Sequence, residues 1–208
     1  MTSRVPPGPF QEGQDYRLRL WDRGHPVLVL ALHGGQIEPG TSPLAARLAG
    51  ADWSLYDFQG IRPHGNGQLH RPSVELVDPR LVELAGRAWI ALSLHGATGV
   101  APLVGIGGRN RRLARRVQRQ LAALGVVCVD LGAGLQGRAR RNPVNWPLRR
   151  GVQLELSAGL RRQLARPAAA VAFCVALRQG VAAYLVQPLT NRDPSVSTGS
   201  PMGSPVNE

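Results

Sequence analysis

The sequence contains no lysine. All 25 basic residues are arginines, and against 13 carboxylates they give a formal net charge of +12. A GC-rich coding bias also replaces lysine by arginine, so this absence alone indicates no mechanism. A positive field of this size nevertheless attracts polyanions. Charge by itself does not choose among a nucleic acid, an anionic membrane and an acidic polymer.

Cysteine is scarce, and long apolar runs are missing. Cys128 and Cys174 lie inside the apolar runs VVCVD and AFCVAL, which is typical of buried free thiols and argues against a disulfide, a redox pair or a cysteine metal site. The first ten residues, MTSRVPPGPF, lack the apolar stretch of a signal peptide. We also find no membrane-spanning run and therefore expect a cytoplasmic protein that does not bind a membrane. The oligomeric state stays open.

Aromatic residues make up only 5% of the chain. The segment from Arg109 to Leu124 is amphipathic, with arginines opposite an apolar face. These arginines, and a second cluster from Arg138 to Arg141, are candidates for contacts with nucleic-acid phosphates. The alternative is a solvated helix face in an arginine-rich protein. Because few aromatic residues accompany the clusters, a single-strand stacking platform is disfavoured, and nucleic acid is the weaker of the expected partners.

The pattern along the chain predicts one folded domain. Residues 1–14, rich in proline, glycine and glutamine, predict a flexible arm, and residues 187–208, polar and without periodicity, predict a disordered tail. Between them, residues 15–186 alternate strand-like and helix-like patterns. This alternation predicts a single three-layer α/β domain with a mostly parallel or mixed central sheet.

Strands are expected at 16–21, 27–32, 53–58, 69–74, 89–94, 126–129 and 152–156, the runs at 27–32, 89–94 and 126–129 being buried. Helices are expected at about 43–48, 79–86, 109–124 and 167–185. Ser42 and Asp78, each followed by proline, are the predicted caps of the first two helices, and Ser157 is a further cap. The run from Gly105 to Gly108 is expected to be a glycine loop, but it lacks the spacing and the lysine of a phosphate-binding loop.

One strand end carries two side chains suited to catalysis. The apolar run from Val27 to Leu32 stops at His33, and Gly34 and Gly35 separate that histidine from Glu38. Glycines allow the backbone to curl and bring the imidazole and the carboxylate to one point. An imidazole and a carboxylate from one loop are ligands that a catalytic zinc takes. The alternative is an ordinary turn with a hydrogen-bonded histidine.

A second strand ends in the same way, because the run WIALSL stops at His95. Neighbouring parallel strands present their carboxyl ends to one crevice, so His33, Glu38 and His95 make a candidate zinc site with an open position. Each imidazole merely capping its strand end is the competing interpretation. Glu155 lies in the apolar run VQLEL and is the candidate general base, since a lone buried carboxylate is costly unless it is paired or functional. A salt bridge to a nearby arginine is the alternative for Glu155.

Five segments, in this order, resemble one known family. They are ALHGGQIEPGTSPLA, LHRPS, ALSLHG, GIGG and GVQLELSAGLR. Their order and spacing over about residues 15–185 closely resemble the poly-γ-glutamate hydrolase family, a phage-associated group with bacterial relatives. The first and last segments are specific, whereas the others are weak alone. The resemblance implies a fold similar to that of the zinc carboxypeptidases and cleavage of γ-glutamyl amide bonds.

Carried over by position, the resemblance implies that Zn²⁺ is held by His33, Glu38 and His95 and that Glu155 is the general base. The family usually has an LHITS-type segment where this chain has LHRPS, so Arg71 and Pro72 are expected to change the local shape of the cleft. His70 is therefore expected to line the cleft rather than to bind the metal.

The resulting expectation is a zinc-dependent amidohydrolase acting on an acidic polymer or a γ-glutamyl peptide. Arg161 and Arg109 are candidates for holding an oxyanion or a substrate carboxylate, because the guanidinium fork matches carboxylate geometry. Asn142 is a candidate for the lining of the cleft. Three alternatives stay open: a carboxypeptidase, an acyl-amino-acid deacylase with the same site, and a basic nucleic-acid-binding protein without catalysis.

Overall fold

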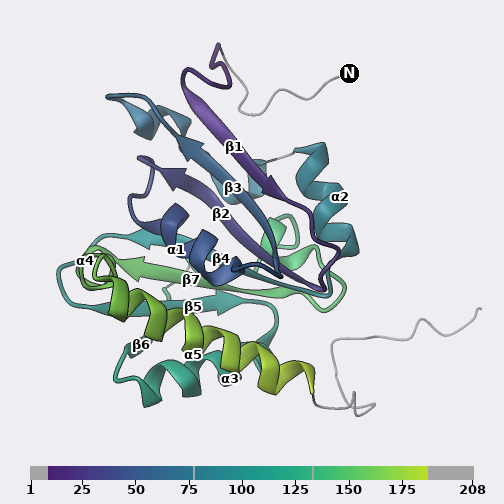
Figure 1. Cartoon of the computed structure of the whole chain (residues 1–208), viewed down its shortest axis with the longest axis vertical. Helices are drawn as coiled ribbons and strands as arrows, with labels where there is room; N and C mark the ends of the chain where they lie inside the picture. The colour runs from purple at the N-terminus through teal and green to yellow at the C-terminus, as the bar shows by residue number, and fades with distance from the viewer. Residues whose placement is uncertain (1–8, 77, 133, 187–208) are drawn as a thin grey trace, which may run out of the picture.

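The computed structural model describes residues 9–76, 78–132 and 134–186, which form a three-layer α/β domain around one seven-stranded sheet (Figure 1). In chain order the strands are β1 (Tyr16–Trp21), β2 (Val27–Gly35), β3 (Ser54–Gly60), β4 (Ile90–Ala97), β5 (Leu103–Gly108), β6 (Val127–Asp130) and β7 (Gly151–Ser157). They lie side by side in the order β1-β3-β2-β4-β7-β5-β6. Strands β3, β2, β4 and β7 are parallel, whereas β1 at one edge and β5 with β6 at the other run in the opposite direction. The sheet is therefore mixed.

Helices cover both faces of this sheet. They are α1 (Thr41–Ala49), α2 (Pro79–Arg87), α3 (Arg111–Ala123), α4 (Ala158–Leu164) and α5 (Pro167–Leu185). Short 3-10 turns lie at Asn66–Leu69, Ser73–Glu75 and Pro143–Asn145. Helices α1, α3 and α5 pack on one face and α2 on the other (Figure 1). Each face thus has its own hydrophobic core.

The central strands β4 and β7 are apolar on one face and polar on the other. Their apolar side chains in the core beneath α1, α3 and α5 include Leu92, Leu94, Leu154 and Leu156. Their buried polar side chains are Ser93, His95, Gln153, Glu155 and, at the end of β7, Ser157. The register pairs Ser93 with Gln153 and His95 with Glu155. Because side chains alternate across a strand, these four polar groups lie together on the face away from α1, α3 and α5.

The expected glycine loop is a strand, and this prediction was wrong. Gly105 and Gly107 belong to β5, which pairs antiparallel with β7. A Cβ atom on Gly105 would lie 2.0 Å from the side chain of Leu131, and one on Gly107 would lie 2.3 Å from the carbonyl oxygen of Gln136. The missing side chains therefore let the segment after β6 lie directly against the strand. Close packing, rather than loop flexibility, explains these glycines.

Three further predictions of local structure were wrong. Residues 69–74 form no strand, because this segment bends through the two 3-10 turns that flank His70. Strand β6 is a partly exposed edge strand rather than a buried one. Ser42 does not cap α1, since Gly40 holds that position. The Ser42 hydroxyl instead donates to Oδ1 of Asp57 at 2.6 Å and accepts from the Gly35 backbone at 2.7 Å.

The last helix, α5, is long and apolar. Although no membrane-spanning run was expected, α5 is long and apolar enough to cross a membrane by length and composition, with a mean hydropathy of 1.6. Its buried side chains, including Phe173, Leu177 and Val181, join the core on the sheet, which is how a core helix of a globular domain behaves. Residues 1–8 of the predicted arm and the predicted tail, 187–208, lie outside the described residues.

Candidate metal centre

The turn after β2 brings Glu38 back onto His33. The backbone nitrogen of Glu38 donates to the carbonyl oxygen of His33 at 2.9 Å. A Cβ atom on Gly34 would lie 2.2 Å from Oγ of Ser42, and Gly35 has a φ of 62°. The turn therefore needs both glycines. It leaves Oε1 of Glu38 only 3.1 Å from Nδ1 of His33.

His95 reaches the same point from the neighbouring strand. Its Nδ1 lies 3.2 Å from Nδ1 of His33 and 3.7 Å from Oε2 of Glu38. The backbone nitrogen of Gly96 donates to Oε2 of Glu38 at 2.8 Å and fixes the carboxylate across the two strand ends. Strands β2 and β4 are parallel neighbours, so the shared mouth predicted for these strands is present.

The hydrogen bonds of the two histidines leave lone pairs facing one another. Nε2 of His33 donates to the carbonyl oxygen of Arg71 at 2.7 Å, so its Nδ1 is unprotonated in the neutral ring. Nε2 of His95 lies 2.9 Å from Oγ of Ser93, and donation to that hydroxyl leaves its Nδ1 unprotonated as well. Two nitrogen lone pairs and a carboxylate then meet without a proton between them. A cation satisfies this arrangement, and partners on the far ring nitrogens are the usual support of metal-binding histidines.

The distances also agree with one small ion. Metal–nitrogen bonds of about 2.0–2.1 Å in a tetrahedral site place two ligand nitrogens about 3.3 Å apart, and the two Nδ1 atoms are 3.2 Å apart. The residues His33, Glu38 and His95 therefore fit zinc in number, type and spacing.

His70 makes a fourth donor at the same place. Its ring stacks on that of His33 with a centroid distance of 4.0 Å, and its Nε2 lies 3.5 Å from Oε1 of Glu38. Donor atoms of His33, Glu38 and His70 all lie within 4.8 Å of one another. His70 is about half exposed, whereas His33 and His95 are buried. It thus lines the cleft, and its distance to Glu38 also makes it an alternative third ligand.

The environment sets the protonation of these groups. Burial, together with nearby His33, lowers the pKa of His95 to about 3, which keeps its ring neutral as a metal requires. Burial and His33 also lower the pKa of His70. Burial would raise the pKa of Glu38, but its close contacts with His33 and His95 and the hydrogen bond from the Gly96 amide outweigh burial and lower it.

Glu155 lies beside this cluster on β7. It is buried, and its backbone pairs with that of His95. Burial, and then the charge of Glu38, raise its pKa to about 7. Nε2 of Gln153 donates to its Oε1 at 2.8 Å. The hydrogen-bond partner of this carboxylate is thus an amide, whereas the salt-bridge alternative required an arginine.

A cavity of about 620 Å³ contains all of these groups. Its lining includes His33, Glu38, His70, His95, Asn142, Gln153, Glu155 and the rim residue Arg138. The amide nitrogen of Asn142 donates to Oε1 of Gln153 at 2.9 Å. Asn142 therefore lies in the cleft, as predicted. Gln153 and Arg138 were not among the predicted site residues. Gln153 shares a strand face with Glu155, and that spacing of two residues was the available signal.

The two arginines named from the sequence lie elsewhere. Arg161 donates from Nε to Leu156, from Nη1 to Pro39 and from Nη2 to Ala97, in each case to a carbonyl oxygen, at 3.2, 2.7 and 3.0 Å. It ties together three strand-end segments and is outside the cavity lining. Arg109 follows β5, whose direction opposes that of β7, so it lies at the other end of the sheet. Neither is placed to hold an oxyanion in this cavity.

A model of the protein family described as poly-gamma-glutamate hydrolase matches residues 9–170. The chain belongs to the poly-gamma-glutamate hydrolase family. Two curated relatives from Bacillus subtilis (strain 168) are YndL, 34% identical over 159 residues, and the prophage-derived YoqZ, 31% identical over 156 residues. These alignments cover 74% and 72% of this chain but only 62% and 55% of the relatives. The chain therefore spans less than two thirds of the length of either relative.

Solved structures of the family have the same fold. A bacteriophage poly-gamma-glutamate hydrolase superposes with a TM-score of 0.80 at 25% identity, over 85% of this chain and 92% of that one. YndL in a zinc-free form superposes with a TM-score of 0.76 at 29% identity, over 83% and 92%. The predicted α/β fold of the zinc-carboxypeptidase kind is thus confirmed.

Proposed function

We propose that this member of the poly-gamma-glutamate hydrolase family is a zinc-dependent hydrolase that cleaves γ-glutamyl amide bonds. The observation that carries the proposal is the convergence of His33, Glu38 and His95 beside Glu155 in one cavity. The bacteriophage relative supports the substrate, and the existence of a zinc-free form of YndL supports the metal.

The metal would be held by His33, Glu38 and His95. A zinc ion held there would supply Lewis-acid chemistry, polarising a substrate carbonyl and making water more acidic. The chain's own contribution is to keep the imidazole of His95 neutral, through burial, and to orient the two rings through Arg71 and Ser93. These far-side contacts hold the rings in the geometry that binding needs.

Glu155 supplies the proton transfer. We assign it as the general base that takes a proton from the attacking water and then delivers it to the leaving amine. Its burial raises its pKa to about 7, which suits a group that must both accept and release a proton near neutral pH. Because Gln153 holds Oε1, Oε2 is the oxygen assigned to carry the proton.

His70 and Asn142 would shape the substrate side of the cavity. His70 is half exposed beside Glu38, and Asn142 is buried in the opposite segment of the lining. Each offers hydrogen bonds to an amide or carboxylate of the substrate. In this proposal His70 contacts substrate and is not a permanent metal ligand.

A hydrolysis screen tests the function. Purified protein is offered a γ-linked glutamate polymer, γ-glutamyl dipeptides, ordinary peptides with a free C-terminus and acyl-amino acids, each with and without chelator. The proposal expects cleavage of γ-glutamyl substrates that stops with chelator and returns with zinc. Cleavage confined to ordinary peptides or acyl-amino acids would replace it with the carboxypeptidase or the deacylase alternative. Chelator-insensitive cleavage would contradict the role of the metal.

A further inference from the structure

The positive charge of this protein is confined to one part of the chain. Residues 1–98 contain nine arginines and nine carboxylates, so they balance. Residues 99–166 contain fourteen arginines and only two carboxylates, Asp130 and Glu155. Glu155 is buried in the cavity and does not offset surface charge. A coding bias acts on the whole chain, so it accounts for arginine in place of lysine but not for this segregation.

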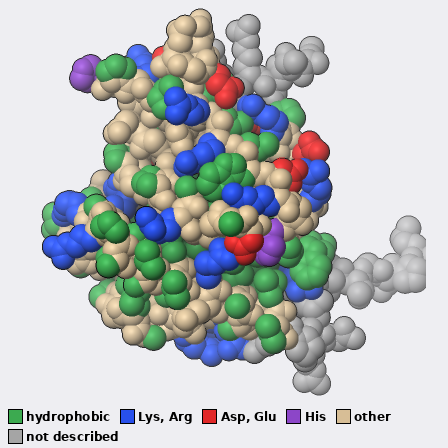
Figure 2. Space-filling model, viewed as in Figure 1, with side chains coloured by type: hydrophobic (Ala, Val, Ile, Leu, Met, Phe, Trp, Pro, Cys, Tyr) green, Lys and Arg blue, Asp and Glu red, His purple; other side chains and the backbone are tan. Residues whose placement is uncertain are grey.

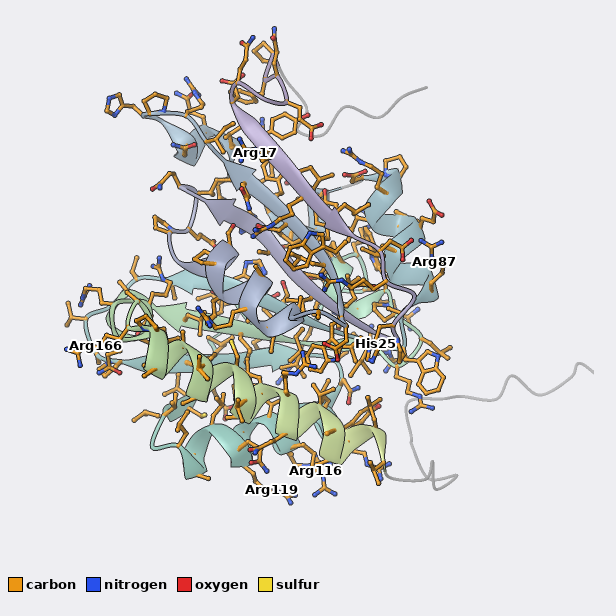
Figure 3. The ribbon with its side chains drawn as sticks, in the orientation of Figure 1. Arg17, His25, Arg87, Arg116, Arg119 and Arg166 are labelled. Carbon is orange, nitrogen blue, oxygen red and sulfur yellow. The ribbon has the colours of Figure 1, made fainter. Side chains whose placement is uncertain are left out.

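The arrangement of charge on α3 does not help the helix to form. Its first turn carries Arg111 and Arg112 and no acidic residue, although the helix dipole favours negative charge there. Arg111 and Arg115, and Arg115 and Arg119, are spaced four residues apart, and like charges at that spacing destabilise a helix. Arg116 and Arg119 extend from the outer side of α3 (Figure 3), and basic side chains form the lower edge of the surface there (Figure 2). Local stability therefore gives no reason for this charge.

Hydrogen bonds join this surface to the cavity. The side-chain nitrogen of Asn145 donates to the carbonyl oxygens of Gly137 and Ala139 at 2.7 and 2.9 Å, on either side of Arg138 at the cavity rim. The backbone nitrogen of Arg109 donates to Oδ1 of the same Asn145 at 3.0 Å. Asn110, the next residue, caps α3. Asn145 therefore connects the rim of the cavity to Arg109, and Arg109 leads directly into the first turn of α3.

Other arginines gather along this path. Asn145 bonds both to Arg109 and to Ala139, and Arg140 follows Ala139 directly, so the two arginines lie on segments held by one side chain. Slight burial and the charges of nearby Arg150 and Arg140 also lower the pKa of Arg109, which agrees with this placement. Arg138 and Arg140 are exposed on the segment that lines the cavity. We call the surface made by the following residues the arginine belt: Arg109, Arg111, Arg115, Arg119, Arg138 and Arg140.

We propose that the arginine belt is an accessory binding surface for the anionic substrate chain, continuous with the cavity at Arg138. A γ-linked glutamate polymer carries a free carboxylate on every unit, and the guanidinium fork pairs with carboxylates. When one amide bond occupies the cavity, the belt binds units that extend beyond the rim. This inference rests on the proposed function for the identity of the chain.

Nucleic acid is the competing partner for a basic surface. The continuity of the belt with the cavity favours the substrate, because a separate nucleic-acid surface has no reason to end at Arg138. The low aromatic content of the chain also disfavours stacking on bases. The two partners are distinguished by the experiment.

The test compares two double variants that lose the same charge. The belt variant is Arg109→Gln with Arg140→Gln, both outside the catalytic groups. The control is Arg17→Gln with Arg166→Gln, which lie on β1 and before α5 at other parts of the surface (Figure 3). Turnover is measured on a γ-glutamyl dipeptide and on a long γ-linked glutamate polymer. Binding of the labelled polymer, and of a DNA oligonucleotide, is measured on chelator-treated protein at several salt concentrations.

The belt variant is expected to raise the KM and the Kd for the polymer roughly tenfold, the scale of two partly exposed charge pairs. Its kcat, its KM for the dipeptide and its zinc content should match those of the parent. The parent should lose polymer affinity as salt rises, and the belt variant should lose less. The control variant should change none of these values.

If the belt variant and the control variant change the KM and Kd for the polymer equally, or if neither changes them, the proposed binding role of the arginine belt is wrong. Belt-dependent DNA binding tighter than polymer binding would overturn it in favour of a nucleic-acid surface. If the parent cleaves no γ-glutamyl substrate but its chelated form binds the polymer through the belt, the proposed function fails and the binding surface stands. If it cleaves both substrates and the belt variant binds the polymer normally, the function stands and the belt fails.

Discussion

Gln153 and Glu155 lie two residues apart on β7, and Nε2 of Gln153 donates to Oε1 of Glu155 at 2.8 Å. The same amide nitrogen donates to the carbonyl oxygen of Leu135 at 3.2 Å, and Asn142 donates to Oε1 of Gln153. Gln153 therefore connects the candidate base to the segment that closes the cavity. A carboxylate held at one oxygen has a fixed direction for its other oxygen.

Replacing Gln153 by leucine tests this connection. We expect kcat on a γ-glutamyl substrate to fall at least tenfold, because a hydrogen bond to a charged group is lost, while KM and zinc content stay the same. The comparison variant is Ser93→Ala, on the same face of the sheet in the neighbouring strand β4, where the hydroxyl contacts His95 rather than Glu155. It should weaken zinc binding about 10–100-fold instead. An unchanged kcat in the leucine variant would show that Gln153 does not position the base.

Glu155→Gln tests the base directly. Gln is nearly isosteric and Glu155 is not among the proposed ligands, so bound zinc and thermal melting should be retained. Activity should fall by roughly 10²-fold or more, the scale of general acid–base catalysis. Elemental analysis, melting and turnover are measured on the same sample. A zinc-loaded variant with full turnover would rule out the assigned role.

The third metal ligand is decided by comparing His95→Ala with His70→Ala. Elemental analysis should show that His95→Ala loses zinc, because the buried Nδ1 atoms of His95 and His33 form the proposed site. His70→Ala should keep zinc and raise KM. The reverse pattern, with zinc lost only from the His70 variant, would assign His70 as the ligand in place of His95.

Gly107→Ala should destabilise the protein by about 1–3 kcal/mol, the usual cost of forcing an extra group into a packed site. Its new Cβ atom would meet the Gln136 carbonyl oxygen at 2.3 Å and push away a segment that lines the cavity. Gly86→Ala in α2, where a Cβ has open space, should instead stabilise by about 0.5–1 kcal/mol. Urea unfolding measures both, and equal stabilities would contradict the close approach.

The two thiols should differ in reactivity. Burial raises the pKa of Cys174 to about 11, so at pH 8 roughly one molecule in a thousand is ionised by the Henderson–Hasselbalch relation, and the thiolate is the reactive form. Cys128 is less buried. A thiol reagent at pH 8 should modify Cys128 first in the folded protein, and both residues equally fast in denaturant. Rapid modification of Cys174 before unfolding would contradict its burial.

The sequence by itself determined the parts of the site that depend on local order. His33 and His95 each follow an apolar strand, and Glu38 follows the first strand after a two-glycine turn. Parallel strands place their carboxyl ends at one edge, so the sequence predicted that these three residues would meet, and the direct pairing of β2 with β4 brings them together. Burial of Glu155 followed from its apolar neighbours in VQLEL.

Only the tertiary structure decided which groups surround that centre. Strand β5 pairs antiparallel with β7, a strand distant in sequence. Arg109, which follows β5, therefore lies at the end of the sheet opposite to the carboxyl end of β7. Arg161 lies near Glu155 in sequence, yet carbonyl oxygens of three segments occupy its guanidinium. Arg138 instead lines the cavity, in a segment that Asn145 holds through the carbonyl oxygens of Gly137 and Ala139 on either side of it. Composition shows how many arginines exist, but contacts between distant segments decide where each of them points.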